Sequence, residues 1–359
     1  MLSVLRPITR WVLVASQGTT LALTWPLWLC RDDPPLVHRF DLPAWDAGPL
    51  LVASLVAVLI PDLLALLRRP GPRWLGPLTV AVHALALGLA MAQDELRIQP
   101  QVIVPALLLF ATLPGDGARL FGLGVLASMW GWAGLHKILS ERYLDGFGST
   151  VVGPLFPGLP EGAIAAVCRS ISYGELAMGL CVLAVPFTRW GLLRWGLVAA
   201  GLGLHGTILL SLWKLGHNPS VWPWNISSAV AAAWLIATTR SPFVAHLRTA
   251  GWVARAGVLA LLAVPTGFYF GLTHPYFAFS VYSSNTPQAT VENAMGREFP
   301  MRYIKAFESF IPPTHRNYRT IFLHRCRPGE QLIITDDRGW AQRNDRERVV
   351  VRYGDDIDP

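Results

Sequence analysis

The sequence predicts an all-α polytopic membrane bundle of about nine transmembrane helices (range about eight to nine), with a small C-terminal α+β or mainly β extramembrane domain. Only 15% of the residues are charged and 52% are hydrophobic, whereas soluble domains carry about a quarter charged residues. Apolar stretches of spanning length recur from Ile8 to Leu272, and charges become dense from about Tyr276 onward. We therefore expect a membrane part at 1–274 and a water-facing part at 275–359.

Nine apolar segments approach the roughly 20 residues that a spanning helix needs. The fourth is short and could be a half-helix. The first ends in Trp25–Cys30 rather than at a small-residue cleavage site, so we interpret it as a span and not as a cleaved signal peptide. The predicted spans are 8–30, 49–67, 74–92, 101–115, 118–139, 161–186, 190–213, 220–239 and 253–272.

Alternate loops differ in charge, which predicts the topology. One set is rich in arginine, so the positive-inside rule makes it cytoplasmic, together with the N-terminus. The opposite set carries Asp32, Asp33 and Asp41 with no comparable basic excess, and an odd number of spans leaves the C-terminal domain outside. We expect a bacterial inner-membrane protein with a periplasmic or extracellular C-terminal domain. The arginine-rich set contains Arg6, Arg10, Arg68, Arg69, Arg73, Arg119, Arg189, Arg194, Arg240, Arg248 and Arg255.

Composition also argues against several other classes of protein. The formal charge of +7 lies mainly in loops that set membrane topology, so we expect membrane lipid and not nucleic acid as a partner. Two of the four cysteines, Cys168 and Cys181, are too far apart along one helix to bond each other. Because no Cys-x-x-Cys or paired-histidine spacing occurs in a span, we also expect no metal site.

The C-terminal part contains short β-prone runs separated by turn residues, at 320–323, 331–335 and 348–351. These runs predict a small sheet that caps the bundle or binds a protein partner. The polar residues Asp336, Asp337, His315 and His324 are most simply surface groups.

Ionisable residues at membrane depth are costly and therefore candidate functional groups. Between the third and fourth spans, Glu95, Arg97 and Gln99 form a polar cluster, which we assign to substrate binding. The alternative is a solvated loop in which Glu95 and Arg97 form an ion pair.

Lys137 follows His136 at the outer end of the fifth span. A lysine at this depth can snorkel to the interface, or, because burial disfavours its charged form, it can act as a base. Glu175 lies in mid-span and must be protonated, paired or exposed to water. Arg169 is within reach of Glu175 only through a long extension of both side chains.

A second group of polar residues lies in the seventh span and directly after it. His205 lies in its outward half, and Lys214, His217 and Asn218 come directly after it. We assign Lys137, His205 and Glu175 to catalysis and the loop residues, with His136, to substrate binding.

The order of these segments resembles a known family. Residues 132–138 (Trp-Ala-Gly-Leu-His-Lys-Ile) followed by 143–147 (Tyr-Leu-Asp-Gly-Phe) are similar to the signature of the vitamin K-dependent γ-carboxylase membrane domain, the horizontally transferred transmembrane domain. The likeness continues through Glu175–Leu180 and His205 and covers roughly 75–240. DoxX-like membrane proteins share parts of the pattern.

The resemblance implies that Lys137 is the base-like residue that works with a reduced quinone. The chain departs from the family at Pro100, where the carboxylase has a histidine after two asparagines. Its outer domain is also much smaller than the carboxylase's luminal portion. Both departures argue against carboxylation of glutamate in a protein substrate.

Three functions are consistent with these observations. The first is a membrane enzyme that acts on or with a quinol or other lipid-like substrate at the outer face, with Lys137 as base. The second is a non-catalytic maturation, immunity or assembly subunit that binds a partner through 275–359. The third is a transporter, because Pro61, Pro105 and Pro114 could interrupt helices.

Overall fold

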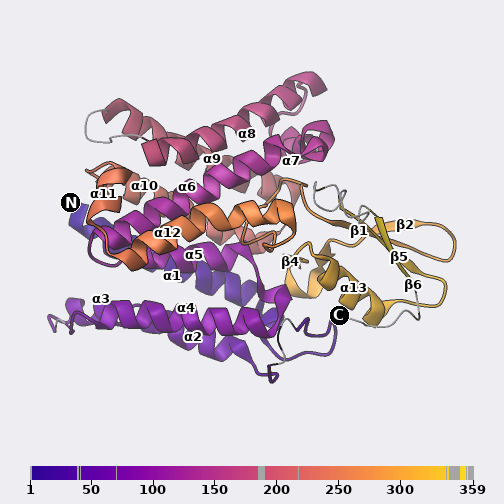
Figure 1. Cartoon of the computed structure of the whole chain (residues 1–359), viewed down its shortest axis with the longest axis horizontal. Coiled ribbons are helices and arrows are strands. Elements are labelled where there is room, and N and C mark those ends of the chain that lie inside the picture. Colours follow the sequence, from indigo (N-terminus) through magenta and orange to yellow (C-terminus); the bar gives the residue numbers. More distant parts are fainter. Residues whose placement is uncertain are drawn as a thin grey trace.

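The computed structural model is mostly helical, with a small sheet near the C-terminus (Figure 1). It describes residues 2–38, 40, 42–69, 71–184, 191–216, 218–336, 338, 348–352 and 354. The helices run back and forth along one axis. We call the end of the bundle beside the sheet the sheet end, and the end at which α1 begins the arginine end.

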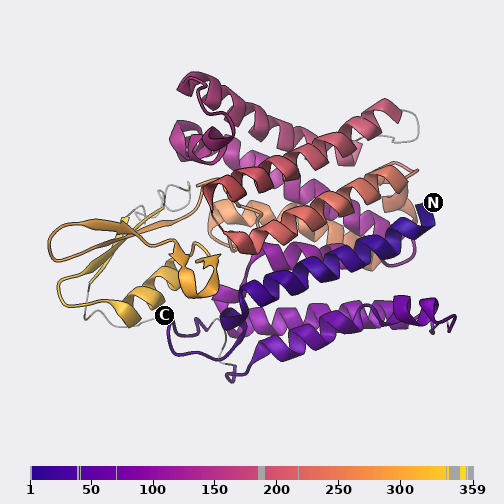
Figure 2. The same ribbon diagram turned by 180° about the vertical axis from the view of Figure 1, so that it is seen from behind.

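The helices of the bundle are connected mostly by short loops. Helix α1 lies across the face seen in Figure 2 and packs against α5 and α10. The bundle consists of α1 (Leu2–Leu23), α2 (Ala47–Ala57), α3 (Ile60–Leu66), α4 (Leu75–Gln93), α5 (Pro100–Ala111), α6 (Asp116–Ile138), α7 (Gly148–Val152), α8 (Glu161–Ala184), α9 (Gly191–Leu215), α10 (Trp222–Thr238), α11 (Phe243–Thr249) and α12 (Trp252–Ala263), with the short helix η2 (Glu95–Arg97) before α5 and η6 (Val264–Phe270) after α12.

Each of the nine predicted segments overlaps a helix of this bundle. Within the described residues, five helices are long and apolar enough to cross a membrane, which fits an integral membrane protein. They are Ala47–Leu66, Leu75–Gln93, Glu161–Ala184, Gly191–Leu215 and Trp252–Phe270. The fourth predicted segment forms α5, a shorter apolar helix of 12 residues.

Proline and glycine explain where several helices begin. Pro61 follows the break between α2 and α3, where its ring and missing N–H interrupt the hydrogen-bond ladder. Pro100 is the first residue of α5, a position where the missing donor costs nothing. Gly115 has φ 103° before α6, a conformation that only glycine adopts easily, and so lets the chain reverse between α5 and α6.

Several of the arginines on which the predicted topology depends lie at one end of the bundle. The turn after α3 (with Arg68), the first residues of α6 (with Arg119) and α11 (with Arg248) lie at the arginine end, whereas Arg189 lies outside the described residues. Arg10 is buried there and donates to Asp62 Oδ1 at 3.0 Å and to the Thr112 carbonyl at 2.9 Å. This buried arginine therefore ties α1 to α3 and to the end of α5.

The C-terminal part contains a four-stranded antiparallel sheet with the order β2-β1-β5-β6. Its buried face includes Ala289, Leu332, Ile334 and Val351, and α13 packs against β5. The elements are β1 (Gln288–Glu292), β2 (Glu298–Pro300), β5 (Gln331–Thr335), β6 (Arg348–Arg352) and α13 (His315–Arg325), with a short hairpin of β3 (Tyr303–Ile304) and β4 (Ser309–Phe310) beside them.

Two expectations for this part were wrong. The run 320–323 is not a strand but the second half of α13, because Thr314 caps the helix by accepting from the Asn317 N–H, and Tyr318, Ile321 and Phe322 then face the core at helical spacing. Asp336 is not a surface group but is fully buried, where it accepts hydrogen bonds from Arg338, and Asp337 lies outside the described residues. The other two runs form β5 and β6.

Candidate functional site

The structure brings Lys137 and Glu175 together in the sheet-end half of the bundle. Lys137 lies in the last turn of α6 and Glu175 in α8, and the Lys137 Nζ to Glu175 Oε2 distance is 2.6 Å. The side chains are only 8% and 3% exposed. Lys137 therefore does not snorkel to the interface, and the partner of Glu175 is Lys137 rather than Arg169.

Glycines let α6 and α8 approach closely enough for this pair to form. A Cβ on Gly134 would lie 2.4 Å from the Leu176 nitrogen, and a Cβ on Gly179 would lie 2.5 Å from the Gly131 nitrogen. Small residues at such crossings allow two helix backbones to touch, as is common between membrane helices. The glycine contacts set the distance between the helices, and the ion pair follows from it.

A cavity of about 280 Å³ lies beside the ion pair. Helices α8 and α9 contribute most of its lining residues, and α7 contributes Val151 and Val152. Its walls are mostly aliphatic, including Met178, Leu204 and Ile208. Its polar lining residues are Lys137, Glu175, Tyr143, Thr207, Ser211 and Tyr282. We call this space the Lys137 cavity.

Tyr282 reaches the Lys137 cavity from the chain that follows the bundle. The surrounding segment, 276–284, packs against the helix ends, and Phe279, Tyr282 and Ser284 all have positive φ, at 58°, 53° and 54°. Side-chain residues rarely adopt this region, so the packing around the segment must hold it. Burial raises the pKa of Tyr282 further above its ordinary value, which already lies above neutral pH, so the phenol is a hydrogen-bond donor there.

Asn218 is next to the cavity rather than in it. Its Nδ2 donates to the Tyr282 hydroxyl at 3.2 Å, and its Oδ1 accepts from Ser220 at 2.8 Å. Asn218 therefore positions a residue of the cavity wall.

His136 points away from the Lys137 cavity. Its Nδ1 is 2.7 Å from the Tyr269 hydroxyl, and its Nε2 is 2.8 Å from the Ala278 carbonyl oxygen. Both ring nitrogens are thus engaged in joining the end of α6 to the segment after α12. This histidine supports the site and does not line it.

His205 is also buried outside the lining of the cavity. Its Nδ1 is 3.1 Å from Asn225 Oδ1, and its Nε2 accepts from the Trp130 indole at 3.4 Å. The neighbouring residues Leu204 and Ile208 do line the cavity. His205 therefore connects α9 to α6 and α10, next to the residues of α9 that line the Lys137 cavity.

The polar cluster between α4 and α5 lies away from Lys137. Arg97 is fully buried and donates to the Leu27 and Leu29 carbonyls at 2.9 and 3.0 Å, and its ion pair is with Asp94 rather than with Glu95. Gln99 donates to the Phe310 carbonyl at 3.0 Å, in the C-terminal domain. Arg97 therefore connects η2 to the chain that follows α1, and Gln99 connects the start of α5 to the C-terminal domain. Neither these two residues nor Glu95 lines the Lys137 cavity.

The last turn of α9 and the loop after it contribute little to the cavity in the part that the structure describes. Lys214 is exposed, and its amine lies 3.3 Å from the Pro154 carbonyl oxygen. His217 lies outside the described residues.

Sequence reasoning missed four of the polar lining residues: Tyr143, Thr207, Ser211 and Tyr282. Tyr143 is part of the segment that resembles the carboxylase signature, but the resemblance assigned no function to this tyrosine. Thr207 and Ser211 are four residues apart in α9 and face the same side of the helix as Ile208. A single sequence does not reveal which side of an almost uniformly apolar helix faces a cavity.

The Lys137 cavity brings together side chains that can give and take a proton. Within the described residues, no group of three or more His, Cys, Asp or Glu side chains could hold a metal ion. The Lys137 cavity offers one ammonium, one carboxylate and several hydroxyl groups on an apolar wall.

Comparison of the chain with protein-family models, with curated proteins and with solved structures found no match.

Proposed function

We propose that this chain is an integral membrane enzyme, similar to the vitamin K-dependent γ-carboxylase group, that acts on or with a quinol-like substrate from the lipid phase. Lys137 and Glu175 exchange the proton of a substrate hydroxyl. The observation that carries the proposal is the buried 2.6 Å ion pair on the wall of a largely apolar cavity. Buried charges in a membrane helix are expensive and are kept mainly where they serve a function.

The proposed membrane arrangement has nine crossings, formed by α1, α2 with α3, α4, α5, α6, α8, α9, α10 and α12. The chain direction alternates along this series, so α1 begins at the arginine end and α12 leads to the sheet end. Because arginine-rich loops stay in the cytoplasm, the sheet end then faces outward. In this proposed arrangement, the Lys137 cavity lies in the outer half of the membrane.

A reduced quinone fits the chemistry of the cavity. Its ring is apolar, and its two hydroxyl groups can both donate and accept hydrogen bonds. Lys137, Glu175 and Tyr282 would hold the hydroxyl end, and the aliphatic side chains of α8 and α9 would contact the ring. When bound, the quinol supplies an acidic hydroxyl and a reduced ring.

The ion pair offers one proton acceptor in either of its two states. With both groups ionised, the acceptor is the Glu175 carboxylate; after proton transfer across the 2.6 Å contact, it is the Lys137 amine. In both cases the substrate O–H bond breaks, and its electron pair stays on the oxygen. The resulting oxyanion is stabilised when an ammonium is beside it in a site of low dielectric.

The experiment is retention of a short-chain quinol by the protein in nanodiscs under anaerobic conditions, measured by mass spectrometry after gel filtration. The test variant is Gly174→Phe, because Gly174 lines the Lys137 cavity and a Cβ there meets no atom within 4 Å. We expect the bulky ring to lower retention about tenfold by occupying the space. Gly203→Phe is the matched control, because its Cβ is equally free and it does not line the cavity. Equal retention by both variants would refute the proposal.

A partner-binding subunit is the second candidate function, supported by apolar residues on the sheet. Met295 and Phe299, in the hairpin of β1 and β2, are 75% and 53% exposed. The hairpin extends away from the bundle (Figure 1). If the chain is a docking subunit, Met295→Glu with Phe299→Glu abolishes partner binding, whereas Gly174→Phe does not affect it.

A further inference from the structure

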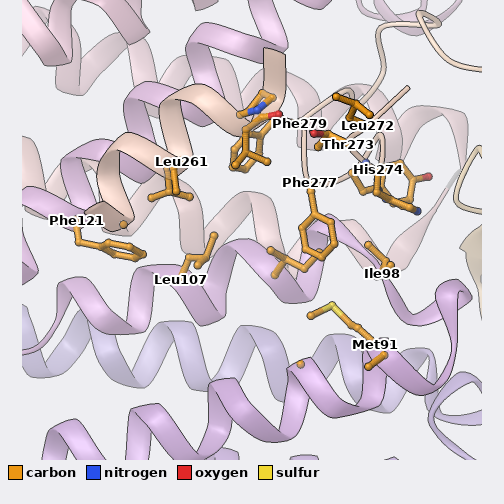
Figure 3. A pocket seen from close by; sticks show the side chains of 18 of the residues that line it. Met91, Ile98, Leu107, Phe121, Leu261, Leu272, Thr273, His274, Phe277 and Phe279 are labelled. Carbon is orange, nitrogen blue, oxygen red and sulfur yellow. Dashed lines mark hydrogen bonds between the residues drawn. The ribbon is translucent and has the colours of Figure 1, made fainter. Parts of the chain in front are cut away.

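A second and larger cavity of about 640 Å³ lies on the other side of α6. Helix α4 packs against α5 and α12 packs against α6, and the cavity lies between α4 and α12 (Figure 3). Its walls are apolar over most of their length, with Phe121, Leu107 and Leu261 toward one end. Polar side chains reach it at the sheet end, where Thr273 and His274 lie. We call it the apolar groove.

A third cavity, of about 470 Å³, continues from that polar end. Four residues line both spaces: Phe40, Leu272, Thr273 and His274. The third cavity lies between the bundle and the C-terminal domain, and its further lining residues include Glu95, Thr314, His315, Arg316 and Arg338. We call it the polar chamber. An apolar groove that opens into a polar chamber matches the shape of an amphipathic molecule.

Glu95 is the acidic residue that lines the polar chamber. It is 5% exposed, and its Oε1 accepts from the Thr314 hydroxyl at 2.8 Å. Among the described residues its ion-pair partner is His274, whose Nε2 lies 3.8 Å from Glu95 Oε1. This histidine is charged only when it is protonated. A buried carboxylate without a permanent cation is costly, so a cationic group of a ligand would stabilise it.

The basic residues of the chamber differ in how far their charge is compensated. Arg338 donates to both oxygens of Asp336, at 2.9 and 2.6 Å, so its charge is matched inside the domain. Arg316 is exposed, and its guanidinium donates to the carbonyl oxygen of His38 at 3.4 Å. A guanidinium held mainly by a carbonyl oxygen can also bind a phosphate.

We propose that the groove and chamber together bind one glycerophospholipid whose headgroup carries a primary ammonium. One acyl chain lies in the apolar groove, the ammonium contacts Glu95, and the phosphate contacts Arg316. A choline headgroup lacks N–H donors for Glu95, and a glycerol headgroup lacks the positive charge. The site is separate from the Lys137 cavity, so it stands or falls independently of the proposed enzyme function.

The test is the lipid that stays bound after purification from nanodiscs made of equal parts phosphatidylethanolamine, phosphatidylcholine and phosphatidylglycerol, identified by native mass spectrometry. The unaltered chain retains phosphatidylethanolamine in preference to the other two. Gly88→Phe fills the apolar groove, because Gly88 lines it and a Cβ there meets no atom within 4 Å. We expect retention to fall about tenfold, while Gly203→Phe, outside the groove, retains lipid normally.

The headgroup is tested separately by Glu95→Gln, which keeps an oxygen acceptor for Thr314 but removes the charge. Losing a charge-assisted hydrogen bond should reduce the preference for ethanolamine over choline about tenfold. Glu298→Gln, an exposed carboxylate on β2, is the control and leaves the preference unchanged. If Gly88→Phe retains as much lipid as the unaltered chain, the acyl chain does not lie in the apolar groove and this part of the proposal is wrong. A preference for phosphatidylglycerol, or one that survives Glu95→Gln, overturns the assigned headgroup.

Discussion

Replacing Lys137 with methionine should destabilise the bundle much more than replacing both members of the ion pair. At 2.6 Å and an effective dielectric constant of about 20, the attraction between the two charges is about 6 kcal/mol, before the cost of removing them from water. Removing one partner leaves the other charge buried, which costs about 3–5 kcal/mol. The double variant Lys137→Met with Glu175→Leu buries no charge, and we expect it to lose less than about 1 kcal/mol.

The assay is unfolding of each variant by SDS in mixed micelles, followed by tryptophan fluorescence, with the free energy of unfolding compared across the four proteins. Glu175→Leu alone should resemble Lys137→Met alone, because each leaves one charge buried. A double variant as unstable as either single variant would refute the reasoning, since the pair would then not be the source of the cost. A single variant as stable as the parent would show that water reaches the remaining charge.

Two further predictions concern packing and pH. Gly179→Leu should separate α6 from α8 and cost about 3 kcal/mol or more, because its Cβ would lie 2.5 Å from a backbone nitrogen; differential scanning fluorimetry should show a lower Tm for it than for Gly203→Leu, which has free space. Burial raises the pKa of Asp336, but hydrogen bonds from Arg338 and His315 outweigh it and lower the pKa to about 2. Because the folded pKa lies below the unfolded value, the resulting stability of about 2 kcal/mol is full above roughly pH 4 and is lost as the pH falls toward 2. Asp336→Asn should remove this pH dependence in thermal unfolding followed by the circular dichroism of the sheet, and an unchanged acid profile would contradict it.

The sequence was a good guide to elements whose signal is local. Runs of apolar residues predicted nine helical segments, and two of the three β-prone runs became β5 and β6. The run 320–323 was misassigned because β-branched and aromatic residues suit both states when the run is short. The capping hydroxyl of Thr314 and the packing of α13 on β5 stabilise the helix at this run.

The site was only partly predictable, for a physical reason. Costly charges at membrane depth identified Lys137 and Glu175 singly, but their contact depends on glycines that bring α6 against α8. Tyr282 comes from a segment with positive φ beyond the bundle, which no periodicity indicates. Glu95, Arg97 and Gln99 were grouped with Lys137 because the predicted topology puts all four at the same membrane face. In the structure, none of these three residues lines the Lys137 cavity.

The central claim is that the Lys137 cavity holds the hydroxyl end of a lipid-soluble substrate. The most direct measurement is a density map of the protein in nanodiscs supplied with a reduced quinone. We predict ring-shaped density between α8 and α9, with an oxygen within hydrogen-bond distance of Lys137 Nζ or a Glu175 carboxylate oxygen. A map in which the cavity holds only an acyl chain, or in which the quinone occupies another site, would contradict the account.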